Sequence, residues 1–343
     1  MKIWLMLVAA VALKDINDRH KATLETEFRH ISVEQQRQLY SEYVRDFSRP
    51  FSAERFFVFQ QNLKKIVEHN AAGRSWKMGI NEFADETFEE FKSKLLMSLP
   101  QNCSATQGNY GFTGASVPDS FDWREKGMVS PVKNQAHCGS CWTFSTTGCL
   151  ESHALIHLNQ KFNLSEQQFL DCAGDFDNHG CNGGLPSHAF TYLYYRNGLQ
   201  EETTYPYQAA NGTCAFDKHN AVLNVEGGVV NITALDENAL IEAIATQGPV
   251  SVAFQVVNDF RFYKSGVYQS TDCKNGADDV NHAVLAVGYG IEDGKLHYIV
   301  KNSWSATWGD NGFFKILRNV NMCGIAQCNS YPILKKADGS PLF

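Results

Sequence analysis

The sequence contains no long run of lysine or arginine, no internal repeat and, after its first residues, no apolar stretch that could cross a membrane. Without a basic tract, nothing in the sequence favours a nucleic-acid partner. The net charge is −7, with 20% of residues charged and 43% hydrophobic, which is typical of a globular protein rather than a disordered one. The length of 343 residues suggests about two domains.

The first residues form a short apolar segment. One lysine precedes an apolar run from Ile3 to Leu13, and residues 10–12 are small enough for a cleavage site. The run is too short to span a bilayer, which needs about 20 residues. We therefore predict a signal peptide over residues 1–13 and a lysosomal or secreted protein. Ten cysteines are consistent with such an oxidising compartment.

Some asparagines stand in the Asn-x-Ser/Thr pattern that accepts N-linked glycans. They are Asn102, Asn163, Asn211 and Asn231. The pattern often arises by chance, so these predicted glycosylation sites support the secretory pathway only weakly.

The chain after the signal peptide divides into a charged helical region, a linker and a more apolar body. Residues 14 to about 98 carry an apolar stripe, Phe56, Phe59, Leu63 and Ile66, at helical spacing. Residues 99–118 are rich in Gly, Ser, Thr and Asn and are predicted to be a linker. The body runs from residue 117 to residue 343.

The body changes character midway. Residues 140–195 have a mostly helical pattern, with Pro186 placed at a helix start, and Asp236 is expected to cap a later helix. The runs 250–257, 283–289, 297–301 and 313–317 are rich in β-forming residues. A helical half followed by a sheet half predicts two subdomains with a cleft between them.

The strongest chemical signal is the octet from Gln135 to Trp142, which holds Cys141 at the start of a helical pattern. Backbone N–H groups and the helix dipole at that position favour the thiolate form of a cysteine. Because the helix end contributes only about 1 kcal/mol, work at acidic pH requires an imidazolium close to the thiol. His282, at the start of an apolar strand, is the candidate partner. The amide oxygen of Asn302 could fix the tautomer of its ring, and Trp304 could shield that bond from water.

With these residues the sequence resembles the papain family of cysteine proteases. His282 follows Cys141 by 141 residues, and further matches are the segments 180–184, 302–304, 308–309 and 323–326. The resemblance covers nearly the whole chain and implies an α+β, papain-like fold of two subdomains. One is a helical left domain and the other a β-barrel-like right domain, preceded by a helical inhibitory propeptide. It implies hydrolysis of peptide bonds without a cofactor.

The resemblance also implies roles for individual residues. The Gln135 side chain and the Cys141 N–H would hold the oxyanion. Residues that would contact the substrate are Gly183, Gly184, Leu185, Pro186, Val280, Ala283 and Trp304. One departure is Ser305, where the family usually has glycine.

Disulfide pairs follow from the resemblance, since spacing alone leaves the pairing open. It pairs Cys138 with Cys181, Cys172 with Cys214, and Cys273 with Cys323. Cys149 remains, and we expect it to pack as a small hydrophobic residue.

Residues 99–106, which contain Cys103, resemble a small propeptide fragment that some members of the family retain, bonded to the position of Cys328. A tethered peptide in the cleft would leave an enzyme that removes single residues from N-termini. The alternatives are an ordinary linker that is discarded on activation, and an endopeptidase without this restriction.

The predicted propeptide is residues 14–116, with an inhibitor-type helical region at about 30–90, before a peptidase domain at 117–343. Arg55, Phe59, Asn62, Ile66 and Asn70 follow one propeptide motif of the family, although Phe51 stands where glutamate is expected. Residues 81–85 follow a second motif. Acid would protonate Asp and Glu and loosen the propeptide. Expected partners are peptide and protein substrates, the propeptide itself and cystatin-like inhibitors of a monomeric enzyme.

Two readings from other classes stay open. Cys138 and Cys141 match the C-x-x-C redox pattern before a helix, which a thioredoxin-like protein would use. A relative that has lost activity could serve as a binding protein, although Cys141, His282 and Asn302 are all present. His153 and His157 have a spacing that can bind metal, but no H-E-x-x-H pattern is present, and we predict a solvated helix face and no metal site.

Overall fold

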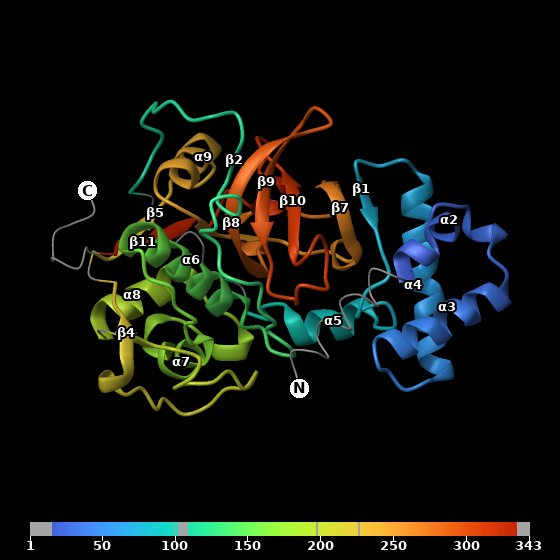
Figure 1. The fold of residues 1–343 in the computed structure, drawn as a ribbon, viewed down its shortest axis with the longest axis horizontal. Helices are drawn as coiled ribbons and strands as arrows, with labels where there is room; N and C mark the ends of the chain where they lie inside the picture. The colour runs from blue at the N-terminus through green and yellow to red at the C-terminus, as the bar shows by residue number, and fades with distance from the viewer. Residues whose placement is uncertain (1–15, 100, 102–108, 197, 226, 335–343) are drawn as a thin grey trace.

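The computed structural model describes residues 16–99, 101, 109–196, 198–225 and 227–334. The predicted signal peptide, the predicted glycosylation site Asn102 and Cys103, the predicted partner of Cys328, lie outside these residues. Figure 1 shows three parts side by side: a group of helices at the N-terminal end, a central sheet, and a second group of helices. No helix of the described residues is long and apolar enough to cross a membrane.

The N-terminal region is helical, as predicted. Its elements are α2 (Lys21–Leu24), η1 (Phe28–His30), α3 (Val33–Asp46), α4 (Ala53–Ala71) and α5 (Phe88–Leu95). The Ser52 hydroxyl accepts a hydrogen bond from the Arg55 N–H and so caps α4. Three members of the predicted stripe, Phe59, Leu63 and Ile66, are buried along this helix. The apolar spacing of the sequence therefore produces the packed face of α4.

Three helices form the helical half of the body. They are α6 (Cys141–Leu158), α7 (Glu166–Cys172) and α8 (Pro186–Arg196), with the short elements η3 (Gly174–Phe176) and η4 (Gly180–Asn182) between them. The predicted start at Pro186 is confirmed. Every residue from Cys141 to Ala154 is buried, so α6 is the central helix of the body. A small sheet joins β3 (Leu199–Gln200) to β4 (Ala221–Leu223), next to η5 (Lys218–Asn220).

The sheet half contains most of the strands. They are β2 (Phe121–Asp122), β5 (Val229–Asn231), β6 (Val250–Phe254), β7 (Tyr263–Tyr268), β8 (His282–Glu292), β9 (Lys295–Lys301), β10 (Phe313–Leu317) and β11 (Ser330–Pro332). Helix α9 (Glu237–Thr246) contacts β8 and β6, and the Asp236 side chain caps it as predicted. The remaining short elements are η6 (Phe260–Phe262), η7 (Ala277–Asp279) and η8 (Met322–Gly324).

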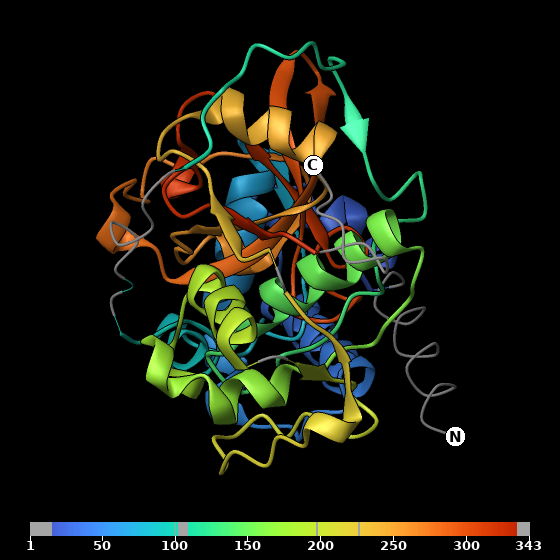
Figure 2. The same ribbon diagram turned by 90° about the vertical axis from the view of Figure 1, so that its left-hand side faces the viewer.

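The sheet is open rather than a closed barrel. Its order is β1-β7-β10-β9-β8-β6-β11-β5, with β2 paired to β8, and among the described residues the end strands β1 and β5 do not pair with each other. Figure 2 shows this sheet above the helices α6 to α8, with the N-terminal helices behind them. The papain-like α+β prediction is confirmed, and its barrel-like half is an open sheet.

One strand of the sheet comes from the N-terminal region. Strand β1 (Trp76–Met78) pairs antiparallel with β7 of the body, with Trp76 opposite Gly266. The bond from the Val267 N–H to the Ser75 carbonyl, 3.0 Å, extends this pairing. The N-terminal region is therefore joined to the body by backbone hydrogen bonds.

Several strands of the body were not predicted from the sequence: β2, β3, β4, β5, β7 and β11. Lysine, serine and glycine interrupt the apolar pattern of β7, and β11 is only three residues long and ends in proline. The predicted strand 250–257 ends at Phe254, because the next two N–H groups bond outside the sheet. The Gln255 N–H donates to the Cys323 carbonyl and the Val256 N–H to the Asn281 side chain.

Residues 109–116, from the predicted linker, lie against α9. The Glu242 carboxylate accepts hydrogen bonds from the Tyr110 hydroxyl and from the N–H groups of Thr113 and Ala115, at 2.6 to 3.2 Å. Glu242 is 1% exposed. This part of the linker is therefore held on the surface of the sheet half.

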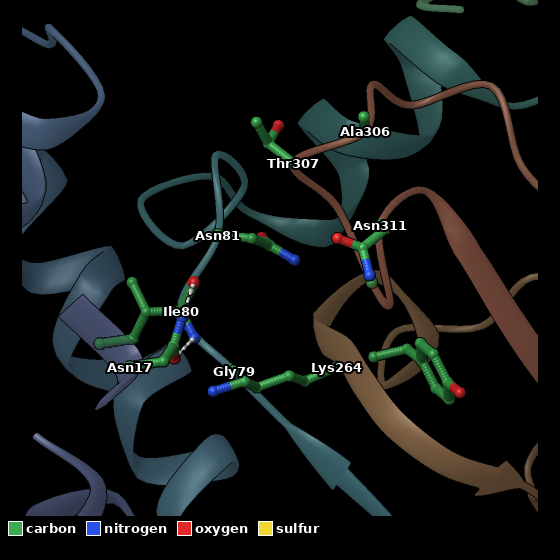
Figure 3. Close-up of a pocket in the computed structure, with 10 residues that line it drawn as sticks. Asn17, Gly79, Ile80, Asn81, Lys264, Ala306, Thr307 and Asn311 are labelled. Carbon is green, nitrogen blue, oxygen red and sulfur yellow. Dashed lines mark hydrogen bonds between the residues drawn. The ribbon is translucent and has the colours of Figure 1, made fainter. Parts of the chain in front are cut away.

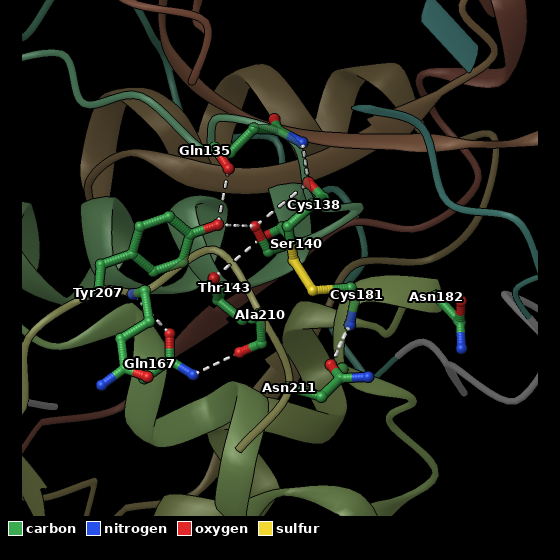
Figure 4. Close-up of a disulfide and its surroundings, with 12 residues drawn as sticks. Gln135, Cys138, Ser140, Thr143, Gln167, Cys181, Asn182, Tyr207, Ala210 and Asn211 are labelled. Carbon is green, nitrogen blue, oxygen red and sulfur yellow. Dashed lines mark hydrogen bonds between the residues drawn. A yellow bond between two sulfur atoms is a disulfide. The ribbon is translucent and has the colours of Figure 1, made fainter. Parts of the chain in front are cut away.

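All three predicted disulfides between described cysteines are present: Cys138–Cys181, Cys172–Cys214 and Cys273–Cys323. Figure 4 shows the first of them beside Gln135 and Ser140. Cys149 is buried as expected, and its thiol donates to the Pro249 carbonyl at 3.2 Å.

Candidate functional site

Cys141 is the first residue of α6 and lies where this helix meets strand β8. The Ala283 N–H donates to the Cys141 sulfur at 3.3 Å, and the Ser145 hydroxyl, one turn further on, donates to the Val284 carbonyl at 2.7 Å. These bonds fix the helix start against the strand that begins at His282. The predicted nucleophile and its predicted partner therefore come from the two halves of the body and meet at their junction.

His282 and Asn302 form the predicted pair. The His282 Nε2 lies 2.8 Å from the Asn302 Oδ1. The Ser303 N–H donates to the same oxygen at 2.8 Å, which identifies it as the oxygen of the amide. An amide oxygen can only accept, so Nε2 carries the hydrogen and Nδ1 keeps its lone pair. Nδ1 has no hydrogen-bond partner and is free to accept a proton.

Trp304 covers this pair. Its ring stacks on the His282 imidazole with 4.6 Å between the ring centres. The Phe91 ring of α5 packs edge-on against the indole with 5.2 Å between the ring centres, and the Phe83 ring centre lies 5.9 Å away. The shielding that the sequence predicted is therefore present, and the N-terminal region extends it.

Burial shifts the pKa of both proposed catalytic groups in the covered site. Cys141 and His282 are both fully buried. Burial raises the pKa of the Cys141 thiol to about 12, although the N–H groups of Ala283 and Trp142 act in the opposite direction. Burial also lowers the pKa of His282 to about 4, against the effect of Asn302. Desolvation in the covered site therefore disfavours both charged forms, whereas the thiolate was predicted for the working enzyme.

Gln135 is fully buried, and hydrogen bonds hold both ends of its side-chain amide. Its Oε1 accepts from the Ser303 hydroxyl at 2.8 Å and from the Trp304 indole N–H at 3.1 Å. Its Nε2 donates to the Cys138 carbonyl and to the Leu95 carbonyl, both at 2.8 Å. The donor predicted for the oxyanion is therefore already bonded to a peptide carbonyl of the N-terminal region.

The last residue of α5 and the residues that follow it lie along the junction of the two halves of the body. Residues 95–99 and 101 form the cleft segment. The Met97 N–H donates to the Asn281 carbonyl at 2.9 Å. The N–H groups of Ser98 and Leu99 donate to the Asn182 carbonyl at 3.0 and 3.2 Å. These are backbone bonds to both halves of the body, so the segment covers the site in the way a bound peptide would.

Gly183 contacts the cleft segment. Its φ is +130°, and a Cβ atom placed there would meet the Gln101 side-chain nitrogen at 2.5 Å and the Met97 Cβ at 3.0 Å. Both the backbone conformation and the close approach require glycine here. The Gln101 side chain is itself 3% exposed. Gly183 therefore lies against the cleft segment, and its contact with a substrate stays a prediction.

The other predicted substrate contacts are buried around the same region. A Cβ at Gly184 would collide with the Trp142 ring and the Asn178 side chain, so this glycine permits packing inside the body. The Leu185 N–H donates to the Asn178 Oδ1 at 3.0 Å. Pro186 begins α8, and Val280 and Ala283 are 2% and 1% exposed. Their contact with a substrate stays a prediction.

Tyr207 is a residue of the site that the sequence did not reveal. Its hydroxyl donates to the Gln135 carbonyl at 2.7 Å and lies 2.6 Å from the Ser140 hydroxyl, as Figure 4 shows. It therefore joins the loop of Gln135 to the residue before Cys141. Nothing in the local sequence around Tyr207 carries a motif that could have identified it.

Buried charges also connect the two halves. Lys133 bonds Glu151 of α6 and Glu166 of α7 at 2.9 and 2.7 Å. Lys301 of β9 donates to the Ser130 hydroxyl at 2.9 Å, and that hydroxyl donates to Glu151. This network lies behind the site and joins the elements that carry Cys141, Gln135 and Asn302.

The helix face with His153 and His157 is not solvated, contrary to the prediction. Their Nε2 atoms lie 2.9 and 2.8 Å from the carbonyls of Pro249 and Gln247, because α6 is covered on this side. The described residues hold no group of three or more His, Cys, Asp or Glu that could bind a metal ion. The remaining predicted glycosylation sites differ in exposure: Asn163 and Asn211 are exposed, and Asn231 is half-buried in β5.

A cavity of about 90 Å³ lies between the N-terminal region and the body, away from Cys141. Figure 3 shows Asn81 and Ile80 on one side of it, and Asn311, Ala306 and Thr307 on the other. Next to it Ser305, the departure from the family pattern, takes a φ of +72°, a conformation that usually favours glycine. The cavity contains none of the predicted catalytic residues.

A thiol beside an imidazole, covered by an N-terminal region, defines the class of protein as a cysteine peptidase in its proenzyme form. Residues 117–333 match the model of the papain family cysteine proteases, and residues 40–91 match the cathepsin propeptide inhibitor domain (I29). The chain belongs to the papain family, and its N-terminal region is the propeptide.

Curated relatives agree with this assignment. Pro-cathepsin H of Mus musculus is 54% identical over 280 residues, which cover 81% of this chain and 84% of that protein. Pro-cathepsin H of Medicago truncatula is 53% identical over 281 residues, covering 82% and 80%. The thiol protease aleurain-like of Arabidopsis thaliana is 52% identical over 281 residues, covering 82% and 78%.

Solved proenzymes have the same fold. The digestive procathepsin L2 proteinase from Tenebrio molitor larval midgut superposes with a TM-score of 0.78 at 36% identity, covering 87% of this chain and 99% of that one. The proform of the ragweed pollen allergen Amb a 11, a cysteine protease, gives 0.80 at 36% identity, covering 90% and 95%. The redox reading has no support, since Cys138 is bonded to Cys181 and Cys141 is a free thiol.

Proposed function

We propose that Cys141 is the nucleophile, His282 the acid and base, Asn302 the residue that orients His282, and Gln135 an oxyanion donor. The observation that carries this proposal is the bond from the Gln135 Nε2 to the Leu95 carbonyl. A peptide carbonyl lies on the donor beside Cys141 in the proenzyme, and a substrate carbonyl would take its place once the propeptide leaves.

The reaction follows from these positions. Removal of residues 95–98 of the cleft segment readmits water and relieves the desolvation of both groups, so the Cys141 proton can pass to the free Nδ1 of His282. The thiolate attacks the scissile carbonyl carbon, and the oxyanion is stabilised by the Gln135 Nε2 and the Cys141 N–H. His282 then protonates the leaving amine as the carbon–nitrogen bond breaks. It next takes a proton from water, which hydrolyses the thioester and frees Cys141.

The finer activity in the proposal is that of an aminopeptidase with a retained peptide of about residues 99–106 in the cleft. Three observations support it. Gln101 is buried against Gly183, Leu99 bonds Asn182, and Cys328 is disulfide-bonded. The proposed partner of Cys328 is Cys103. A peptide tethered there would block substrates that extend beyond one residue on this side, and a carboxylate at Thr106 would pair with the substrate α-amine.

The remaining parts of the proposal concern the localisation, processing and partners of the protein. We place it in the lysosome or outside the cell, with residues 1–13 as the signal peptide and the peptidase domain from residue 117. Glycans at Asn102, Asn163, Asn211 or Asn231, inhibition by cystatin-like proteins and a monomeric state belong to the same proposal. Mass-spectrometric mapping of glycans on the secreted protein tests the glycosylation sites. Size-exclusion chromatography of the native protein tests the monomeric state.

The test is cleavage of two fluorogenic substrates by acid-activated enzyme, one with a free α-amine and one N-blocked, with and without the thiol-directed epoxide E-64. We expect E-64-sensitive cleavage that favours the free amine, no turnover by Cys141→Ser, and near-normal turnover by Cys149→Ser. Activity of Cys141→Ser within about 10³-fold of the parent would contradict the assigned nucleophile, since removal of such a residue costs on the order of 10⁶.

An endopeptidase of the same fold is the second candidate. It is favoured if residues 99–106 are discarded with the rest of the propeptide, and a preference for the blocked substrate would identify it. The Cys141 mechanism would be unaffected by that result.

A further inference from the structure

Arg261 is a buried cation at the edge of the cleft, in η6 just before β7. It is 1% exposed. Its backbone is fixed within the body, because the Trp308 indole N–H donates to its carbonyl at 2.9 Å. Its guanidinium carbon lies 4.4 Å from the centre of the Phe262 ring, so the side chain also has a supporting surface in the body. The position of Arg261 therefore does not depend on the propeptide alone.

The hydrogen bonds of the guanidinium all go to the propeptide within the described residues. Nη1 donates to the Glu86 carbonyl at 2.7 Å and Nη2 donates to the Asn62 Oδ1 at 3.0 Å. Nε is buried with no hydrogen-bond partner. Burial lowers the pKa of Arg261 to about 10, against Glu86 and Glu90, so the group stays charged at any working pH. When the propeptide leaves, this cation loses every one of these acceptors.

The path of the propeptide shows on which side of the scissile bond Arg261 lies. Along the chain, Asn62 and Glu86 meet Arg261, Phe91 then meets Trp304, and Leu95 meets Gln135. Gln101, further on, meets Gly183. Arg261 and Gly183 therefore lie on opposite sides of Cys141 and His282 along this path.

The side of Gly183 is the one that the retained peptide occupies in the proposed function. A substrate whose N-terminal residue is held there must extend its leaving peptide towards Trp304 and Arg261. A planar guanidinium that has lost its acceptors is suited to a carboxylate, which can accept from two of its N–H groups at once. The oxygen atoms of Asn62 and Glu86 occupy that place in the proenzyme.

We propose that Arg261 of the activated enzyme binds an acidic side chain in the first two residues after the scissile bond. The preferred substrates are then peptides in which Asp or Glu closely follows the N-terminal residue that is removed. This inference rests on the proposed aminopeptidase function and adds to it a residue that determines specificity; Arg261 takes no part in the bond-breaking steps.

The test uses enzyme activated from the full-length proenzyme and pairs of peptides with a free α-amine that differ only by Glu or Gln at the first or second position after the scissile bond. We expect a Glu-to-Gln ratio of kcat/KM of about fivefold at one of these positions in low salt, falling towards one in 0.5 M salt, as for a partly exposed ion pair. Each rate is divided by the rate of the same preparation on an aminoacyl coumarylamide.

Variants locate the effect. Arg261→Gln is expected to lose the ratio and Arg261→Lys to keep part of it, whereas Lys264→Gln, which removes a neighbouring cation of β7, keeps it in full. A ratio of one at both positions in the parent enzyme, or an unchanged ratio in Arg261→Gln, would overturn the proposal. If Arg261→Gln does not fold, the parent enzyme still decides: the ratio must fall below pH about 4.5, where glutamate is protonated, and a flat ratio overturns the proposal.

The same peptides with blocked N-termini separate the two proposals. If the blocked peptides are cleaved faster, the aminopeptidase function fails, whatever the Glu-to-Gln ratio is. If the free peptides are cleaved faster with a ratio of one, the aminopeptidase function stands and the role of Arg261 fails.

Discussion

The propeptide contacts the peptidase body through two regions that use different chemistry. Apart from strand β1, whose backbone pairs with β7, its helical part meets the body through buried side chains: Asn62 bonds Arg261, and the Asn81 side-chain amide donates to the Arg261 carbonyl at 2.7 Å. The cleft segment instead uses backbone groups, the Leu95 carbonyl and the N–H groups of Met97 and Ser98. Side-chain contacts depend on residue identity, whereas backbone contacts tolerate most sequences.

The difference explains how a peptide can cover an active site that does not select its side chains. An enzyme that cleaves varied peptides must bind the backbone, so the cleft segment has little sequence information to use. The helical part supplies the specificity at a distance from Cys141. We infer that substitutions in the helical part have larger effects on latency than side-chain substitutions in the cleft segment.

The largest effect is expected for Asn62→Ala. Asn62 is buried, donates to the carbonyls of Ala84 and Glu86, and accepts from Arg261. Its loss leaves a buried charge and two carbonyls with fewer hydrogen-bond partners. This should weaken the binding of the propeptide to the body by about 3 kcal/mol or more. We expect proenzyme at pH 6 to convert to active enzyme more than about 100-fold faster. Gln38→Ala, on the exposed side of α3, is the matched control, and equal rates for the two variants would refute the comparison.

The next effect concerns acid and His69 of the propeptide. Burial lowers the pKa of His69 to about 4, against its bond to the Trp76 carbonyl. A histidine that is neutral when folded stabilises the protein above the unfolded pKa of about 6.5, and this stability is lost as the pH falls from 6.5 to 4. At pH 5 the loss is about 2 kcal/mol. We expect His69→Gln to slow conversion at pH 5 by roughly tenfold or more and to leave it unchanged at pH 7.

This expectation replaces the sequence-based one, in which Asp and Glu loosen the propeptide. The Arg55 side chain, through its hydrogen bonds, lowers the pKa of Glu90 to about 2, so that this contact is lost only below about pH 4.5. Burial raises the pKa of Glu82 to about 7, which favours the folded form as the pH falls to 4.5. The exposed His30 is the control for His69, and His30→Gln should convert at the parent rate at both pH values.

An intermediate effect is expected in the cleft segment when the backbone itself is changed. Met97→Pro removes the N–H that donates to the Asn281 carbonyl. One lost hydrogen bond with an unpaired acceptor costs about 1–2 kcal/mol, so conversion at pH 6 should be roughly tenfold faster. Met97→Leu keeps the N–H and a similar volume, and serves as the control. A similar acceleration by both would show that the side chain, and not the backbone, makes the contact.

The smallest effect is expected for Ser98→Ala. The hydroxyl contacts with Asn182 are both 3.4 Å long and exposed, whereas the Ser98 N–H bond of 3.0 Å is kept by alanine. We expect a change in conversion rate of less than about twofold. An acceleration as large as that of Met97→Pro would mean that side chains hold the cleft segment as well as the helical part. The two regions would then not differ in their chemistry.

The sequence predicted where the proposed catalytic residues stand in the fold, because their motifs are local. Cys141 stands at a helix start within one octet, and His282 begins an apolar strand, and both positions are as expected. Helix α4 and the cap at Asp236 also follow from short-range pattern. By contrast β7 and β11 depend on their partners, since neither has a run of apolar residues of its own.

Amino-acid order by itself determined the helices of the propeptide, the family and the positions of the proposed catalytic residues, because each depends on neighbours a few positions apart. Tertiary structure alone decided the burial of Cys141 and His282, the placing of the Leu95 carbonyl on Gln135, the contacts of Tyr207 and the burial of Arg261. Each of these needs groups from distant parts of the chain to meet and to exclude water, and desolvation and hydrogen bonding then set the pKa values and the exposed surface.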